Sequence, residues 1–162
     1  MTDAFSTYFE SAKARVTALG FKVISEDPNR PWGGFLVIDE QQAAAFCNHF
    51  FSGEALKPDQ KLSPKILLVA PQQRLSWQYH HRRSEVWKAL EGTLWIARSL
   101  KDEIPPPTVF EIDSIVYLKK DERHRLIGGA SPGMVAEIWQ HTDPKAPSNE
   151  EDIVRLQDDY QR

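Results

Sequence analysis

The sequence has a single cysteine, Cys47, and it has no long uninterrupted apolar segment. One cysteine excludes an internal disulfide framework and is typical of a reducing compartment. No apolar run reaches the ~20 residues that a helix needs to cross a bilayer. The first 30 residues mix acidic and polar side chains with apolar ones, unlike a signal peptide. These absences predict a cytoplasmic protein that is not embedded in a membrane.

An excess of basic residues is also missing. Lys and Arg total 20 against 23 for Asp and Glu, so the formal net charge is −3. A general nucleic-acid binder usually carries a strong basic excess, so we expect no nucleic-acid partner, although a local basic pocket remains compatible with this balance. With 162 residues, of which 41% are hydrophobic, the chain is long enough for one domain with its own core.

Two amphipathic helices are predicted in the N-terminal third. Apolar side chains recur every three or four residues over 3–19, and Gly20 follows as a helix-ending residue. We expect this first helix to pack on a sheet as a lid. A second helix is predicted over Glu40–Phe51, with Asp39 as its N-cap and Gly53 as its stop. Cys47 would lie on its buried face as a small core residue.

The connecting segment and the remainder of the chain favour strands. Residues 21–25 fit a short strand, and Pro28 and Pro31 predict a turn at Asn29-Arg30. From Lys65 onward, short runs rich in β-branched and aromatic residues alternate with turn residues, which favours a sandwich or barrel. The predicted strands are 65–70, 75–81, 85–90, 93–98, 108–112, 115–118, 124–127 and 134–140.

Candidate metal ligands gather in residues 75–87, Leu-Ser-Trp-Gln-Tyr-His-His-Arg-Arg-Ser-Glu-Val-Trp. Alternate residues of a strand share a face, which groups Gln78 with His80. If the following strand pairs with this one, Glu85 converges with both. An amide oxygen, an imidazole and a carboxylate suit zinc or a similar divalent ion, and His124 is the best candidate for a fourth ligand. The alternative, a solvated polar rim of a hairpin, is about equally consistent with the spacing alone.

The same segment resembles a known family. Gln78-x-His80-x4-Glu85-x6-Gly92 matches the first cupin motif, in the variant with glutamine in place of the first histidine that is typical of phosphomannose isomerases. Residues 30–33 (Arg-Pro-Trp-Gly), 74–87, and 151–162 with their Asp-Ile-Val-Arg core resemble, in the same order, segments of the cupin domain of type II phosphomannose isomerases. That domain is often fused to a mannose-1-phosphate guanylyltransferase.

Several positions depart from the family pattern. Lys119 and Asp121 stand where the second cupin motif usually has proline and glycine ahead of its histidine, His124. Arg82 replaces the third histidine of the first motif. These 162 residues include no nucleotidyltransferase domain and no phosphate-cradling glycine motif, so we expect no nucleotide-sugar synthesis by them.

The resemblance implies a mainly β fold, a cupin (double-stranded β-helix or jelly-roll) barrel with N-terminal flanking helices. We expect one cupin domain over 1–162, with a helical extension and opening segment at 1–53, the barrel core at 65–141 and a C-terminal segment at 142–162. Cupin barrels often pair through their edges, so a homodimer is expected.

The activity implied is a metal-dependent isomerisation of a small sugar phosphate, mannose 6-phosphate to fructose 6-phosphate, through a cis-enediol. The metal would be held by Gln78, His80, Glu85 and His124, with zinc as the first choice and manganese, cobalt, nickel or iron as alternatives. Two other interpretations stay open, an isomerase of another sugar and a non-catalytic cupin that binds a sugar or sugar phosphate.

The implied substrate needs cationic contacts for its phosphate. Arg30, Arg83 and Arg125 are candidates because guanidinium matches phosphate in a bidentate geometry. Arg155, in the closing segment, is the preferred catalytic arginine, to orient the substrate or stabilise enediolate charge. The proton-transfer residue stays open among four side chains, Glu137, Lys119, Lys120 and His81.

Overall fold

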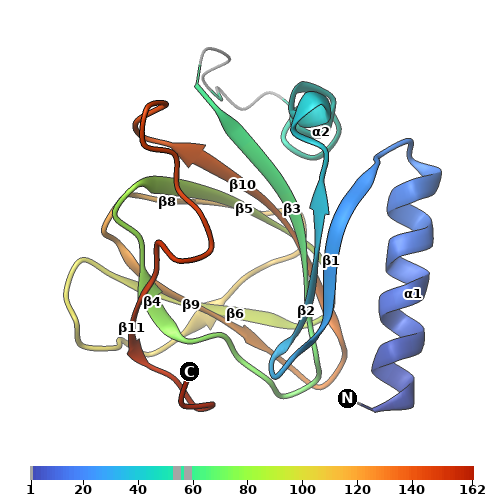
Figure 1. The fold of residues 1–162 in the computed structure, drawn as a ribbon. Helices are drawn as coiled ribbons and strands as arrows, with labels where there is room; N and C mark the ends of the chain where they lie inside the picture. Colours follow the sequence, from blue (N-terminus) through green and yellow to red (C-terminus); the bar gives the residue numbers. More distant parts are fainter. Residues whose placement is uncertain (1, 53–55, 57–59) are drawn as a thin grey trace.

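The computed structural model describes residues 2–52, 56 and 60–162. Two antiparallel sheets face each other, and both helices lie against the outside of one of them (Figure 1). The six-stranded sheet has the order β1 (Val23–Arg30), β2 (Gly33–Ile38), β3 (Leu62–Val69), β10 (Gly133–His141), β5 (Arg83–Glu91) and β8 (Ile115–Leu118). The five-stranded sheet has the order β11 (Val154–Gln157), β4 (Trp77–Tyr79), β9 (Arg123–Gly128), β6 (Leu94–Ser99) and β7 (Thr108–Val109).

The six-stranded sheet is buried on both faces, and this explains the nearly continuous burial of β10. On its outer face, alternate residues such as Ala136 and Ile138 join a core with the two helices. On its inner face, Val135 joins a second core with Leu94 and Leu126 of the opposite sheet. Because each face of this sheet adjoins a core, most positions of β10 carry apolar residues, with only a few polar ones between them.

The predicted helices are confirmed with one adjustment. Helix α1 spans Asp3–Ala18, buries Phe5, Phe9, Ala12 and Val16, and packs on β1 and β2 as the expected lid. Gly20, with φ of +94°, follows its C-cap. The second helix begins with a 3₁₀ turn at Glu40–Gln42, where the Asp39 side chain accepts a hydrogen bond from the Gln41 N–H, and continues as α2 (Ala43–Phe50). Cys47 is partly buried against the outer core. The predicted stop, Gly53, lies outside the described residues.

The predicted turn at Asn29-Arg30 is wrong. Both residues belong to β1, and the chain reverses at Pro31 and Trp32 instead. Pro28 is tolerated because β1 is an edge strand with an irregular register between Asp27 and Arg30, so the missing N–H costs no ladder bond. Strands β2 and β11 were not predicted, whereas the eight runs from residue 65 onward all contain strands.

The C-terminal strand β11 lies alongside β4 and closes the edge of the five-stranded sheet (Figure 1).

Among the described residues, no helix is both long enough and apolar enough to cross a bilayer.

Candidate functional site

Three buried side chains bring metal-ligating atoms together between the two sheets. The Nε2 atom of His80 lies 3.2 Å from Oε1 of Glu85, and Nε2 of His124 lies 3.5 Å from Oε2 of the same carboxylate. All three ligand atoms fall within 4.8 Å of one another. Each residue is at most 2% exposed, so the predicted solvated rim of a hairpin is excluded for these side chains.

The reason for this convergence differs from the predicted one. Strands β4 and β5 do not pair; β4 belongs to the five-stranded sheet and β5 to the six-stranded sheet. Within the five-stranded sheet, Gln78 of β4 lies directly opposite His124 of β9, so their side chains share a face. Glu85 reaches the same point from the inner face of the opposing sheet. The ligands therefore meet across the barrel interior.

Backbone carbonyls orient both imidazole rings. Nδ1 of His80 donates to the carbonyl of Asp152 at 2.7 Å, and Nδ1 of His124 donates to the carbonyl of Glu122 at 2.9 Å. A carbonyl can only accept, so each ring carries its proton on Nδ1 and directs the Nε2 lone pair toward Glu85. Burial lowers the pKa of both rings, that of His80 to about 3, which keeps them in the neutral form that binds a metal.

The site passes a direct test for a cation. Nε2 of His124 is buried and has no hydrogen-bond partner among the described residues. An unpaired buried acceptor costs free energy unless something binds it. Two imidazoles and one carboxylate are the usual donor set of zinc and related divalent ions. The residues present therefore fit a divalent metal.

Gln78 lies beside this group as the expected amide donor. It is 8% exposed, and its Oε1 atom accepts a hydrogen bond of 2.6 Å from the Ser76 hydroxyl. The second lone pair of that oxygen remains available. Its role as a fourth ligand stays a prediction.

Arg83 contacts the same ligands. Its Nε donates to Oε1 of Glu85 at 2.7 Å, and one Nη donates to Nε2 of His80 at 3.2 Å. The guanidinium group also stacks 3.6 Å above the Trp139 ring. A metal bound through Nε2 of His80 takes the lone pair that Arg83 now occupies, so metal binding and this hydrogen bond exclude each other.

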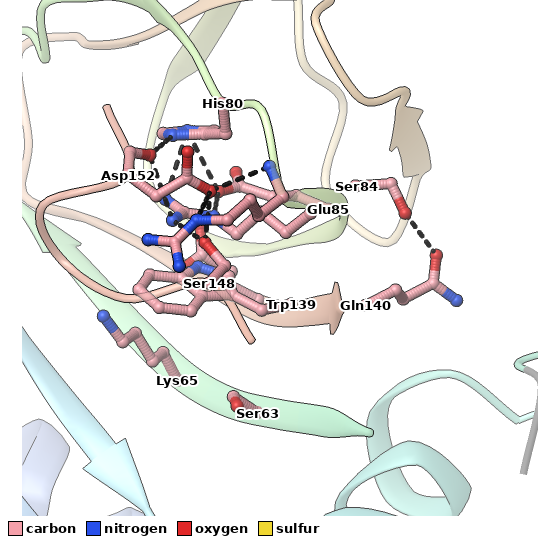
Figure 2. Close-up of polar contacts among 12 residues, drawn as sticks. Ser63, Lys65, His80, Ser84, Glu85, Trp139, Gln140, Ser148 and Asp152 are labelled. Carbon is pink, nitrogen blue, oxygen red and sulfur yellow. Dashed lines mark hydrogen bonds and ion pairs between the residues drawn. The ribbon is translucent and has the colours of Figure 1, made fainter. Parts of the chain in front are cut away.

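The closing segment holds the ligands in place. The Asp152 carboxylate accepts hydrogen bonds from the backbone N–H groups of His81 and Arg82, at 3.0 Å each, and from the Ser148 hydroxyl at 2.6 Å. Figure 2 shows Asp152, Ser148, His80 and Glu85 in one hydrogen-bonded cluster beside Trp139. The sequence alone did not reveal this positioning role of Asp152, and the only signal for it was the Asp-Ile-Val-Arg segment itself.

Glu137 is a second carboxylate on the inner face. It is 4% exposed, and its two oxygens accept hydrogen bonds from the indole N–H groups of Trp87, at 2.7 Å, and Trp139, at 2.8 Å. Burial and the negative charge of Glu85 raise the pKa of this carboxyl to about 8. For Glu85, burial acts in the same direction, but its interactions with His80 and with the Arg83 guanidinium, which donates a hydrogen bond to it, bring its pKa below the ordinary value.

Cationic side chains surround one pocket that Gln78, Glu85 and Glu137 also line. They are Arg30, Lys65, Arg83, Arg155 and Arg162. Burial and the like charges of Arg162 and Arg30 lower the pKa of the Arg155 guanidinium. In the part of the chain that the structure describes, that guanidinium has no hydrogen bond or ion pair, whereas Arg30 pairs with Asp27 and Arg162 with Asp158. Arg155 is thus the cation best placed to receive an anion.

The other predicted residues lie elsewhere. Arg125 is not among the pocket-lining residues; its guanidinium donates to the side chain and the carbonyl of Gln157 in β11. His81 is largely exposed and pairs with Asp121, and Lys119 and Lys120 are exposed. Of the four candidates for proton transfer, only Glu137 lines the pocket.

Comparison with known sequences identifies a family. Residues 49–158 match the family described as mannose-6-phosphate isomerase C-terminal. The xanthan biosynthesis protein XanB of Xanthomonas campestris pv. campestris (strain B100) is 28% identical over 133 residues, which cover 82% of this chain and 23% of XanB. XanB from a second strain, ATCC 33913, is 27% identical over the same length. The chain therefore spans less than a quarter of the length of these relatives.

Solved structures agree on the fold. The capsular polysaccharide assembling protein CapF from Staphylococcus aureus matches with a TM-score of 0.55 and 17% identity, over 83% of this chain and 34% of CapF. Vicilin from Solanum lycopersicum matches with a TM-score of 0.55 and 14% identity, over 80% of this chain and 32% of vicilin. Both are cupin proteins, and the predicted cupin fold is confirmed.

Proposed function

The chain belongs to the mannose-6-phosphate isomerase C-terminal family, and from this premise we propose that it is a metal-dependent aldose–ketose isomerase of a sugar phosphate. Its proposed substrate pair is mannose 6-phosphate and fructose 6-phosphate. The observation that carries the proposal is the free, buried Nε2 of His124 beside His80 and Glu85, next to a pocket rich in arginine. One end of this arrangement suits a metal and the other suits a phosphate.

The proposed cation is divalent, with zinc as the first choice among the metals that accept this donor set. His80, Glu85 and His124 would hold it, and Gln78 would add an amide oxygen. When bound, such an ion supplies Lewis-acid stabilisation to oxygen atoms of the substrate that gain negative charge. The carbonyls of Asp152 and Glu122 keep the two imidazoles oriented for it.

The phosphate end is assigned to the exposed side of the pocket. Arg155 makes no hydrogen bond or ion pair within the described chain, so it would bind the phosphate directly. Arg30 and Arg162 lie close enough to affect its pKa and would add to the positive potential. Arg83 lies deeper, against Glu85 and His80. We therefore expect it to contact the reacting end of the sugar rather than the phosphate.

A coupled assay tests the proposal. The purified protein is loaded with zinc, manganese, cobalt, nickel or iron(II) in turn, its metal content is measured, and the conversion of mannose 6-phosphate is followed. We expect one metal per chain and turnover with at least one of the metals. A panel of other phosphosugars and free sugars identifies an isomerase with a different substrate.

A second candidate function is a non-catalytic cupin that binds a sugar or a sugar phosphate. The observation that favours it is the contact of Arg83 with two of the three ligands, because a guanidinium already balances the charge of Glu85 without a metal. Metal-free protein that binds mannose 6-phosphate, and that gains no turnover with any metal, would support the binder and contradict the isomerase.

A further inference from the structure

We propose that Glu137 is the residue that carries the proton between C1 and C2 of the substrate. This inference rests on the proposed isomerase function and names the residue that the function requires. Glu137 lies in the centre of β10, and among the carboxylates that line the pocket it is the one that contacts neither a metal ligand nor a cation.

Position is the first argument. Glu137 stands opposite Trp87 of β5 on one side and opposite Lys65 of β3 on the other, so all three side chains share the inner face of the sheet. The Trp87 indole N–H lies 2.7 Å from Glu137 and 3.1 Å from Glu85. One donor thus bridges the metal-ligand carboxylate and Glu137, which places Glu137 immediately beside the proposed metal site.

The way the carboxylate is held is the second argument. Each of its oxygens accepts one indole N–H, from Trp87 or Trp139. A carboxylate oxygen has two lone pairs, so each keeps one lone pair for a proton. Two aromatic rings fix the group in one orientation without neutralising its charge, whereas the nearby Glu150 is ion-paired with Lys65. A general base needs this combination of fixed position and a free lone pair.

The chemical step balances without any further reactant. The Glu137 carboxylate removes the proton from C2 of the open-chain aldose, the C2–H electron pair forms the C1–C2 double bond, and the carbonyl electron pair moves to O1. The resulting enediolate takes a proton at C1 from the Glu137 carboxyl, which exchanges its proton with solvent in a fraction of turnovers, while the hydroxyl proton moves from O2 to O1. C2 is oxidised and C1 is reduced within one molecule.

Exchange of carbon-bound hydrogen with D₂O tests the proposal directly. Uptake of deuterium into mannose 6-phosphate and fructose 6-phosphate is followed by NMR for the metal-loaded wild type and for Glu137→Gln. We expect the exchange rate to fall by about 10²- to 10⁴-fold, the usual contribution of a general base. Metal content and the affinity for a hexitol 6-phosphate, an unreactive reduced substrate, should stay within about threefold. Glu111→Gln is the control, because Glu111 is exposed and is not among the residues that line the pocket.

Two further variants keep the test decisive if Glu137→Gln folds poorly. Glu137→Asp keeps the carboxylate and shortens the side chain by one methylene, so its exchange rate should lie between those of the wild type and Glu137→Gln. Equal rates in the two variants would overturn the base role. Lys65→Met removes a cation from the pocket; if it abolishes exchange while Glu137→Gln does not, Lys65 is the base and the inference is wrong.

The failure of the inference differs from the failure of the proposed function. An active wild type with a Glu137→Gln variant that keeps more than a tenth of the exchange rate overturns the inference alone. A metal-loaded wild type that neither converts any phosphosugar nor exchanges hydrogen with one overturns the isomerase function and this inference with it.

Discussion

Nε2 of His124 lies 3.5 Å from Oε2 of Glu85, although His124 belongs to the five-stranded sheet and Glu85 to the six-stranded sheet. The contact therefore joins the two walls of the barrel. His80 approaches the other oxygen of the same carboxylate. A cation placed here would be held by both sheets, so its binding would also strengthen the closure of the barrel.

Replacement of His124 tests this arrangement. In His124→Ala the only ligand from β9 is lost, and we expect metal content to fall at least tenfold, since even partners outside the ligand shell usually change affinity 10- to 100-fold. Isomerase activity should fall with it. The measurement is metal analysis after dialysis, with His81→Ala as the matched control because that histidine is exposed and pairs with Asp121. Activity that survives metal loss would refute the role of the metal.

The arginine beside the ligands leads to a second prediction. Arg83 is 5% exposed and balances the buried charge of Glu85, so Arg83→Met leaves an uncompensated carboxylate in the metal-free protein. Breaking a buried ion pair in this way costs about 3–5 kcal/mol. Added zinc should restore much of that loss, because the cation replaces the guanidinium. The zinc-induced rise in melting temperature should therefore be larger in the variant than in the wild type.

Arg82→Met is the control for that experiment, because the Arg82 side chain is 38% exposed and contacts no metal ligand in the described structure. We expect its stability to change by less than about 1 kcal/mol. A zinc response in Arg83→Met that matches the wild type would show that the metal and the guanidinium do not compete.

The sequence predicted the identity of the site residues better than the strand pairing that brings them together. Alternation along a strand assigns a residue to a face, and this was sufficient to group Gln78 with His80. It does not identify the partner strand, and so the predicted pairing of β4 with β5 was wrong. Pairing across a barrel depends on contacts far apart in the sequence, such as that of Gln78 with His124.

The proton-transfer residue illustrates the same limit. Glu137 was one of four open candidates because a lone glutamate in an apolar strand carries no distinctive spacing. Its environment depends on Trp87 of the neighbouring strand and on Trp139 two residues away. Likewise, strand β11 was not predicted, because its four residues, Val-Arg-Leu-Gln, are too few to establish an alternating pattern. It forms by pairing with β4 rather than by its own propensity.

Arg155 is predicted to act on the substrate and not on the metal. It lines the pocket, and its guanidinium has no partner among the described residues. Arg155→Ala should raise KM for the phosphosugar or lower kcat, with a combined loss in kcat/KM of at least tenfold, while metal content stays unchanged. Arg15→Ala is the matched control, because Arg15 pairs with Glu91 on the outside of the barrel. Unchanged kinetics in Arg155→Ala would assign this arginine to the solvated surface.

The pH dependence of stability provides a last test, one that needs no substrate. Burial raises the pKa of Glu137 to about 8 in the folded protein, against about 4.5 when unfolded. The folded state therefore holds the proton more tightly. Its contribution to stability is fully present below about pH 4.5 and is lost as the pH rises through about 8.

Glu137→Gln lacks this titration. In metal-free protein, the unfolding free energy of the wild type, minus that of the variant, should fall by about 1.4 kcal/mol per pH unit between pH 5 and pH 8. The buried histidines titrate with lowered pKa values in both proteins, so their effect cancels in the difference. Urea unfolding at each pH unit in the presence of a chelator measures it. Parallel stability curves for the two proteins would mean that Glu137 is ionised throughout this range and that burial does not hold its proton.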